Sequence, residues 1–101
     1  MIVYNISMKI DPSIEKDWLR WQQQEHIPAV MASGQFTAYK FYRLLEQDDR
    51  DSITYIIQYF ATSLKNYYSY SEQTAPLLRQ EAVDKWGNKF IAFRTLMQAV
   101  N

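Results

Sequence analysis

The chain has 101 residues, of which 48% are hydrophobic and 16% aromatic, and eleven basic and eleven acidic side chains give a formal net charge of zero. This composition excludes a disordered chain, a nucleic-acid binder with a basic excess and, without cysteine, disulfides or thiolate metal sites. No apolar run near the start is long enough to cross a membrane, and no signal peptide is visible, so we expect one cytoplasmic domain over residues 1–101.

The first expected element is a strand over residues 2–10, where one strongly apolar face alternates with one mixed face. A helix follows, because Asp11 is a good N-cap and Pro12 suits the first helical position. Apolar residues spaced by three and four positions give this helix a buried stripe made of Ile14, Trp18 and Trp21.

A proline then predicts a break in this helix. Pro28 lacks an amide hydrogen and clashes with the turn before it, so we expect the helix to end near Glu25 or His26. A short second helix is expected over residues 28–33, with Gly34 behind it as the stop signal.

The second half of the chain predicts three strands and one helical region. Residues 36–46 and 53–61 read as strands, and the short charged turn between them makes them an antiparallel hairpin. Residues 63–87 form a helical region that begins at a serine N-cap, is interrupted by Pro76 and ends at a glycine. Residues 89–100 read as the last strand.

The order β-α-β-β-α-β predicts a ferredoxin-like α+β fold, a four-stranded antiparallel sheet with its helices on one face. The other face is expected to carry a half-polar set that is too apolar to face water: Val3, Asn5, Ser7, Ile56, Gln58, Phe60, Phe90, Ala92, Arg94 and Leu96. We therefore expect a homodimer in which two such faces stack. The eight tyrosines favour the same conclusion, since one small core hides few large rings.

The chain resembles the dimeric α/β-barrel superfamily, in which two ferredoxin-like units pair through their sheets. The resemblance is carried by the strand at 2–10, by Trp18 and Trp21, by "EHIP" at 25–28 and "SGQF" at 33–36, and by the closing "KFIAFRTLM". That superfamily includes antibiotic-biosynthesis monooxygenases, EthD-like proteins, muconolactone isomerase and stress-responsive barrel proteins. Over its full length the chain looks most like a small bacterial family catalogued only as a domain of unknown function.

His26, the only histidine, is the first candidate for chemistry. An ordinary imidazole titrates near neutral pH and suits general acid or base work. At the end of a helix, the partial negative charge there is expected to favour its cationic form. The alternative is that His26 only hydrogen-bonds a carbonyl freed by Pro28. Several barrel relatives place a functional histidine at a comparable helix end.

Asn5, Gln58 and Arg94 are expected to bind and orient a ligand. Gln58 and Arg94 are placed on adjacent central strands, facing one cavity, and Tyr42 joins them if the strand register allows. The alternatives are an interface salt bridge for Arg94 and a hydrogen-bonded interface amide for Asn5. An asparagine like Asn5 helps position oxygen chemistry in a haem-degrading relative, but no histidine follows His26 to serve as an axial ligand. No cofactor and no metal site are expected.

These observations predict a small homodimeric protein that binds a small, partly apolar molecule between the first helix and the open sheet face. If it is an enzyme, the resemblance implies a cofactor-independent oxygenase or isomerase with His26 as acid or base. The alternative is a non-catalytic interaction protein whose paired sheets serve only to form the dimer. A cavity of about 300 Å³ with His26 at its wall favours the first interpretation.

Overall fold

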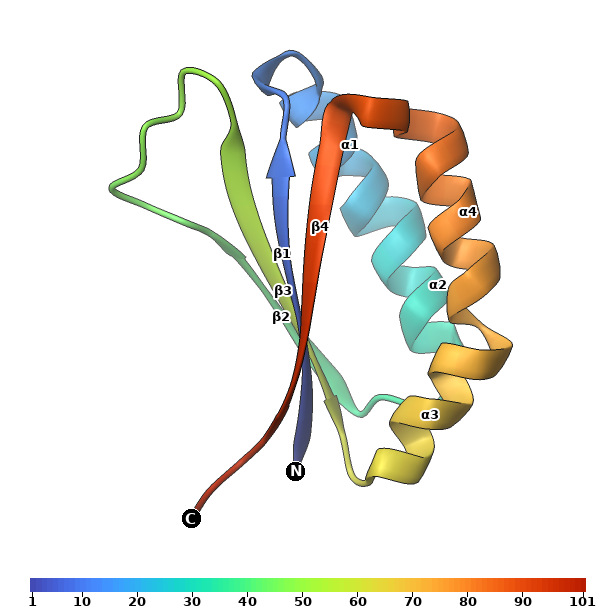
Figure 1. Cartoon of the computed structure of the whole chain (residues 1–101). Helices are drawn as coiled ribbons and strands as arrows, with labels where there is room; N and C mark the ends of the chain where they lie inside the picture. The colour runs from blue at the N-terminus through green and yellow to red at the C-terminus, as the bar shows by residue number, and fades with distance from the viewer.

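The computed structural model describes all 101 residues and consists of a four-stranded antiparallel sheet with every helix on one side of it (Figure 1). The strands lie in the order β2-β3-β1-β4, and their bounds are β1 (Ile2–Ile10), β2 (Ala38–Arg43), β3 (Ile53–Ala61) and β4 (Phe90–Gln98). All three pairings are antiparallel. The expected ferredoxin-like class is therefore confirmed.

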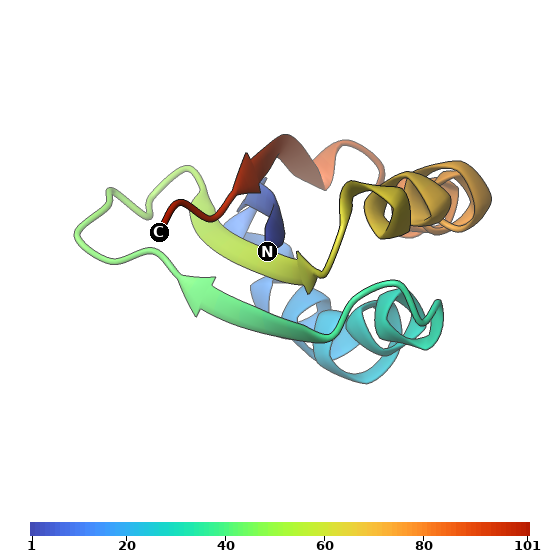
Figure 2. The same cartoon turned by 90° about the horizontal axis from the view of Figure 1, so that it is seen from below.

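Two helical segments cover the sheet and run beside each other, as Figure 2 also shows. Their helices are α1 (Glu15–Trp21), α2 (Ile27–Ala32), α3 (Leu64–Gln73) and α4 (Ala75–Trp86). Ser63 Oγ accepts the Asn66 amide at 3.3 Å and begins α3. Pro76 lies in the first turn of α4, and the break before it at Thr74 confirms the expected interruption.

The expected break before Pro28 is wrong. One π-helical turn, Gln22–His26, joins α1 to α2 without leaving right-handed helical geometry, and the Ile27 amide donates to the Gln22 carbonyl five residues earlier. Such a turn holds one more residue than an α-helical turn. Pro28 lies where the hydrogen-bond spacing changes from five residues back to four. The amide hydrogen that Pro28 lacks would therefore lie between the two regular hydrogen-bond patterns, where neither pattern needs it.

The core lies between the helices and the sheet. Alternate residues of β1 and β3 point into it, which gives both strands a regular buried and half-buried alternation. Trp18 and Ile27 pack onto them from the helical side, at 1% and 2% exposure. The largest core side chains are Trp18, Tyr4, Tyr59, Ile10, Ile27, Ile57 and Val30.

The sheet face expected for the side chains of the last strand is wrong. β4 alternates as expected, but its register sets Arg94 opposite Ile6 and Ala92 opposite Met8 on β1. Since directly paired residues share a face, Phe90, Ala92, Arg94 and Leu96 lie on the helix-covered side of the sheet. The side away from the helices, which we name the open face, instead carries Ile91, Phe93, Thr95 and Met97 of β4.

β2 is shorter than the stretch 36–46 expected from the sequence. It begins at Ala38, because Phe36 leaves the sheet and packs among core tyrosine rings at 5% exposure. The register puts Lys40 opposite Gln58 and Tyr42 opposite Ile56, so both side chains lie on the open face. The β2–β3 hairpin itself is confirmed.

Candidate functional site

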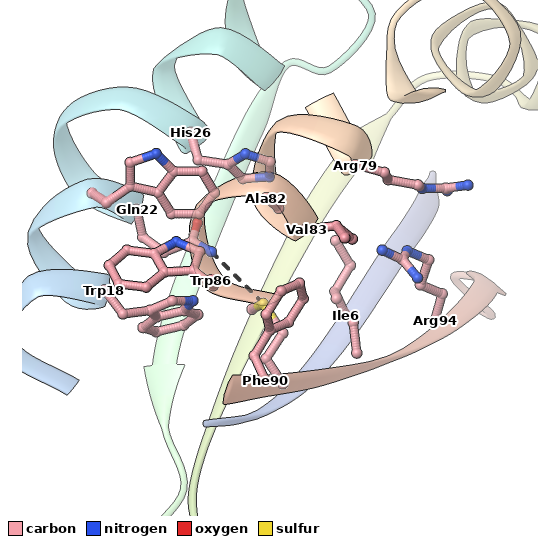
Figure 3. A pocket seen from close by; sticks show the side chains of 13 residues that line it. Ile6, Trp18, Gln22, His26, Arg79, Ala82, Val83, Trp86, Phe90 and Arg94 are labelled. Carbon is pink, nitrogen blue, oxygen red and sulfur yellow. Dashed lines mark hydrogen bonds between the residues drawn. The ribbon is translucent and has the colours of Figure 1, made fainter. Parts of the chain in front are cut away.

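A cavity of about 330 Å³ lies between the helices and one end of the sheet, with His26 in its wall (Figure 3). Its wall combines residues from β1, α1, the π-helical turn, α4 and β4. They are Ile6, Met8, Trp18, Trp21, Gln22, His26, Arg79, Ala82, Val83, Trp86, Phe90, Ala92 and Arg94. The cavity is mostly apolar with a few polar groups, which is the usual composition of a small-molecule site. It lies on the helix-covered side of the sheet, so the expected location at the open face is wrong.

The π-helical turn is what brings His26 to the cavity. In an α-helix, side chains five positions apart point about 140° away from each other. The extra residue of the π turn removes that offset, and the His26 ring stacks on Trp21 at a centroid distance of 4.7 Å. Trp86 of α4 meets Trp21 edge-on at 5.8 Å. The turn also leaves Glu25 exposed on the outer side of the helix.

His26 is held in its neutral form. Burial, and secondarily the positive charge of Arg94, lowers the pKa of His26 to about 4. The expected cationic form is therefore wrong, because the helix continues through His26 into α2 and the expected helix C-terminus is absent there. Its Nδ1 is buried without a hydrogen-bond partner, so capping of a carbonyl through Nδ1 is not its role either.

Three buried polar atoms of the cavity wall lack partners: Gln22 Oε1, His26 Nδ1 and Trp86 Nε1. Gln22 is only 2% exposed, and its Nε2 has a weak contact of 3.8 Å with Met8 Sδ. Buried polar atoms are normally paired, and an unpaired one costs about 1–3 kcal/mol.

Two guanidinium groups lie on the wall of the same cavity. Arg79 of α4 donates from Nη2 to the hydroxyl of Tyr4 at 3.1 Å, and Tyr4 is almost fully buried. Arg94 of β4 is close enough to His26 to lower its pKa. The site therefore combines a neutral imidazole, aromatic walls and two positive charges, of which that of Arg79 is held by a hydrogen bond.

The site residues predicted from the sequence lie on two opposite faces of the sheet. His26 and Arg94 meet in the cavity. Asn5 and Gln58 lie on the open face, where Gln58 Nε2 donates to Asn5 Oδ1 at 3.2 Å, and Tyr42 lies on the same face at 46% exposure. The expected convergence of Gln58 and Arg94 is wrong, because β1 separates their strands and they point to opposite faces.

Gln22, Arg79 and Trp86 are wall residues that sequence reasoning did not find as site residues. Gln22 follows Trp18 by four positions, so it is a polar residue on a buried stripe. Arg79 precedes Trp86 by seven positions and therefore lies on the same face of α4. Both spacings are visible in the sequence, and polar residues on such stripes are the signal that points to a cavity.

The structure contains no group of three or more His, Asp or Glu side chains that could hold a metal ion. None of its helices has the length and apolar character that a membrane span requires.

Solved structures share this fold at low sequence identity. The chain is similar over 100% of both lengths to an antibiotic biosynthesis monooxygenase, with a TM-score of 0.71 and 14% identity. An EthD family protein from Bacillus halodurans matches with a TM-score of 0.70 and 11% identity, covering 99% of this chain and 100% of that one. SnoaB, a cofactor-independent oxygenase from Streptomyces nogalater, matches with a TM-score of 0.68 and 13% identity, over 99% and 93%. These likenesses establish the fold.

Family membership follows from the sequence itself. No curated protein matches the chain. One family model matches residues 1–100, which is nearly the whole length. The chain therefore belongs to the family described as "Domain of unknown function (DUF4286)".

Proposed function

We propose that this protein binds a small, partly apolar molecule in the cavity between the π-helical turn, α4 and β4. The observation that carries the proposal is a mostly apolar cavity of about 330 Å³ whose wall includes Gln22, His26 and Trp86, each with a buried polar atom that has no partner. At about 330 Å³ the cavity lies at the lower end of the size range of ligand pockets, which favours a molecule of one or two rings.

If the protein is an enzyme, the proposed reaction is that of a cofactor-independent oxygenase or isomerase. A neutral imidazole beside the bound molecule can accept a hydrogen bond at neutral pH, and it becomes an effective base only when binding raises its pKa from about 4. The similarity in fold to SnoaB supports this reaction class. Because the same fold hosts unrelated activities, the residues of the cavity carry more weight than the likeness.

The open face supports a homodimer. Ile91 and Phe93 are 57% and 56% exposed there, and on the neighbouring strand β1 the side chain of Asn5 accepts a hydrogen bond from Gln58. A second copy placed face to face would cover these apolar side chains and surround the polar pair. The alternative function is an interaction protein that uses only this surface and leaves the cavity without a role.

A thermal-shift screen of small aromatic and alicyclic compounds tests ligand binding. A compound present at 100 times its Kd stabilises the native state by about 2.7 kcal/mol, which raises the Tm of a chain this size by about 10 °C or more. The shift should fall sharply in His26→Ala and persist in Gln23→Ala, which changes an exposed side chain of the same turn. If no compound stabilises the wild-type protein, the interaction function replaces this proposal.

A further inference from the structure

The cavity wall carries two arginines without acidic partners. Arg79 and Arg94 come from α4 and β4, and Figure 3 draws both on the same side of the pocket. The salt bridges of the chain involve Arg43, Arg50 and Lys89, whereas neither cavity arginine has a carboxylate within 4.0 Å. Two positive charges are therefore available to an anion from outside the chain.

Both guanidinium groups line the cavity, and both also lie near one buried hydroxyl outside its wall, that of Tyr70. Both oppose the rise in pKa that burial causes at Tyr70, so both lie within electrostatic reach of the same buried hydroxyl. Arg79 is held by its hydrogen bond to Tyr4, which reduces the freedom that it would lose on binding a ligand. Arg94 lies on an edge strand and is exposed, which places it at the mouth of the cavity.

The rest of the wall is aromatic. Trp21 and Trp86 pack edge to face, and Trp18 lies deeper at 1% exposure. A ligand that contacts both the tryptophan rings and the two arginines has a flat apolar body at one end and a negative charge at the other. A carboxylate matches the planar fork of a guanidinium through two parallel hydrogen bonds.

We propose that the cavity selects small aromatic monocarboxylic acids, with the carboxylate bound between Arg79 and Arg94 and the ring packed against the tryptophans. This inference rests on the proposed ligand-binding function and names its ligand class. It also gives His26 a role. The bound carboxylate offsets the charge of Arg94, so His26 becomes more basic only when an acid is present.

Isothermal titration calorimetry with matched acids and amides tests the ligand class. The probes are benzoate, phenylacetate and 1-naphthoate, each paired with its neutral amide. At least one acid should bind ten times more tightly than its amide. Arg79→Gln and Arg94→Gln should each weaken that acid by about tenfold or more and leave amide binding unchanged. Arg20→Gln is the control, because Arg20 is exposed on α1 and lies outside this cavity.

The single histidine gives a second readout, since its ring Cε1–H resonance needs no assignment. The bound acid should raise the His26 titration midpoint, and its amide should not. If no acid is preferred over its amide, or if Arg94→Gln alters only the association of the chain, the acid inference is overturned. Neutral compounds that still bind the cavity would leave the proposed function intact, whereas an absence of all binding would remove both.

Discussion

Among single side chains, His26 has the environment that most affects chemistry at neutral pH. Its ring lies against Trp21, its Nδ1 has no partner, and Arg94 adds a positive charge nearby. A histidine with an unperturbed pKa near 6.5 would be partly charged at neutral pH, whereas this one is neutral. Its uncharged ring is therefore suited to accept a hydrogen bond from a bound molecule, whereas a pKa near 4 makes it a weak base.

The low pKa of His26 predicts a specific pH dependence of stability. The pKa is about 6.5 unfolded and about 4 folded, so between these values the unfolded chain binds more protons. Stability should consequently rise with pH across this window and fall by up to roughly 3 kcal/mol as the pH drops from 7 to 4. Urea unfolding at a series of pH values measures the change in free energy.

Two variants separate His26 from the acidic groups that also titrate in this range. His26→Gln should flatten the part of the stability curve between pH 4 and 6.5. Arg94→Gln should raise the His26 NMR midpoint, by less than the whole shift because burial is the larger cause. A wild-type midpoint near 6.5 would show that the ring is solvated and would contradict the described cavity wall.

At the residue scale, the sequence pointed to two of the polar residues in the candidate cavity. His26 and Arg94 were identified because a lone histidine and a strand arginine are conspicuous, and both lie in the cavity. Asn5 and Gln58 were grouped with them wrongly. Alternation along a strand gives two faces but does not say which one meets the helices, and for the mixed sequence of β4 only its register with β1 decides.

At the scale of elements, the helix caps were predictable and the π-helical turn was not. Ser63 and Gly87 bound the second helical region as expected, since each cap depends on local chemistry. The extra residue in Gln22–His26 instead reflects packing. Trp21 and Ile27 are both buried although they are six positions apart, and this separation fits one side of the helix only if the turn is widened.

Gly87 sets the turn from α4 into β4, and its substitution should be costly. Its φ of 58° with ψ of −128° lies outside the regions that L-residues adopt comfortably. An added Cβ would meet no atom within 4 Å, so the cost comes from the backbone alone. Gly87→Ala should therefore lose about 1–3 kcal/mol in chemical denaturation.

Asn88→Ala is the matched control for this turn, because Asn88 directly follows Gly87 and its side chain is exposed. It should change the unfolding free energy by less than about 0.5 kcal/mol. Equal stability of Gly87→Ala and the wild-type protein would mean that the turn relaxes to another conformation.

At the scale of the whole molecule, the open face predicts self-association. Its exposed rings include Tyr42 and Phe93, which lie on the two edge strands. We expect the wild-type chain to sediment as a dimer at micromolar concentration. Phe93→Asp should weaken the dimer by about 100-fold or more, since it buries a charge in a paired sheet face.

Leu77→Asp is the control for surface charge, because Leu77 is 66% exposed on the outer side of α4. It should leave the dimer intact. A wild-type protein that sediments as a monomer at micromolar concentration would exclude face-to-face pairing. An equal effect of both aspartates would place the contact elsewhere.

The fold as a whole was predictable because each connection is short and β1 and β3 alternate strictly. The position of the cavity was not. It forms where α1, α4 and the start of β4 meet, and that meeting depends on the side of the sheet that β4 presents. Sequence patterns describe each of these elements but not the space between them.

Chemical-shift mapping tests the ligand cavity most directly. The compound that gives the largest thermal shift is titrated into ¹⁵N-labelled protein while backbone amide and indole N–H resonances are followed. Saturable shifts should centre on Gln22, His26 and the indole N–H of Trp86. Shifts centred on Asn5, Gln58 and Phe93 of the open face would contradict the proposal that the ligand lies under the helices.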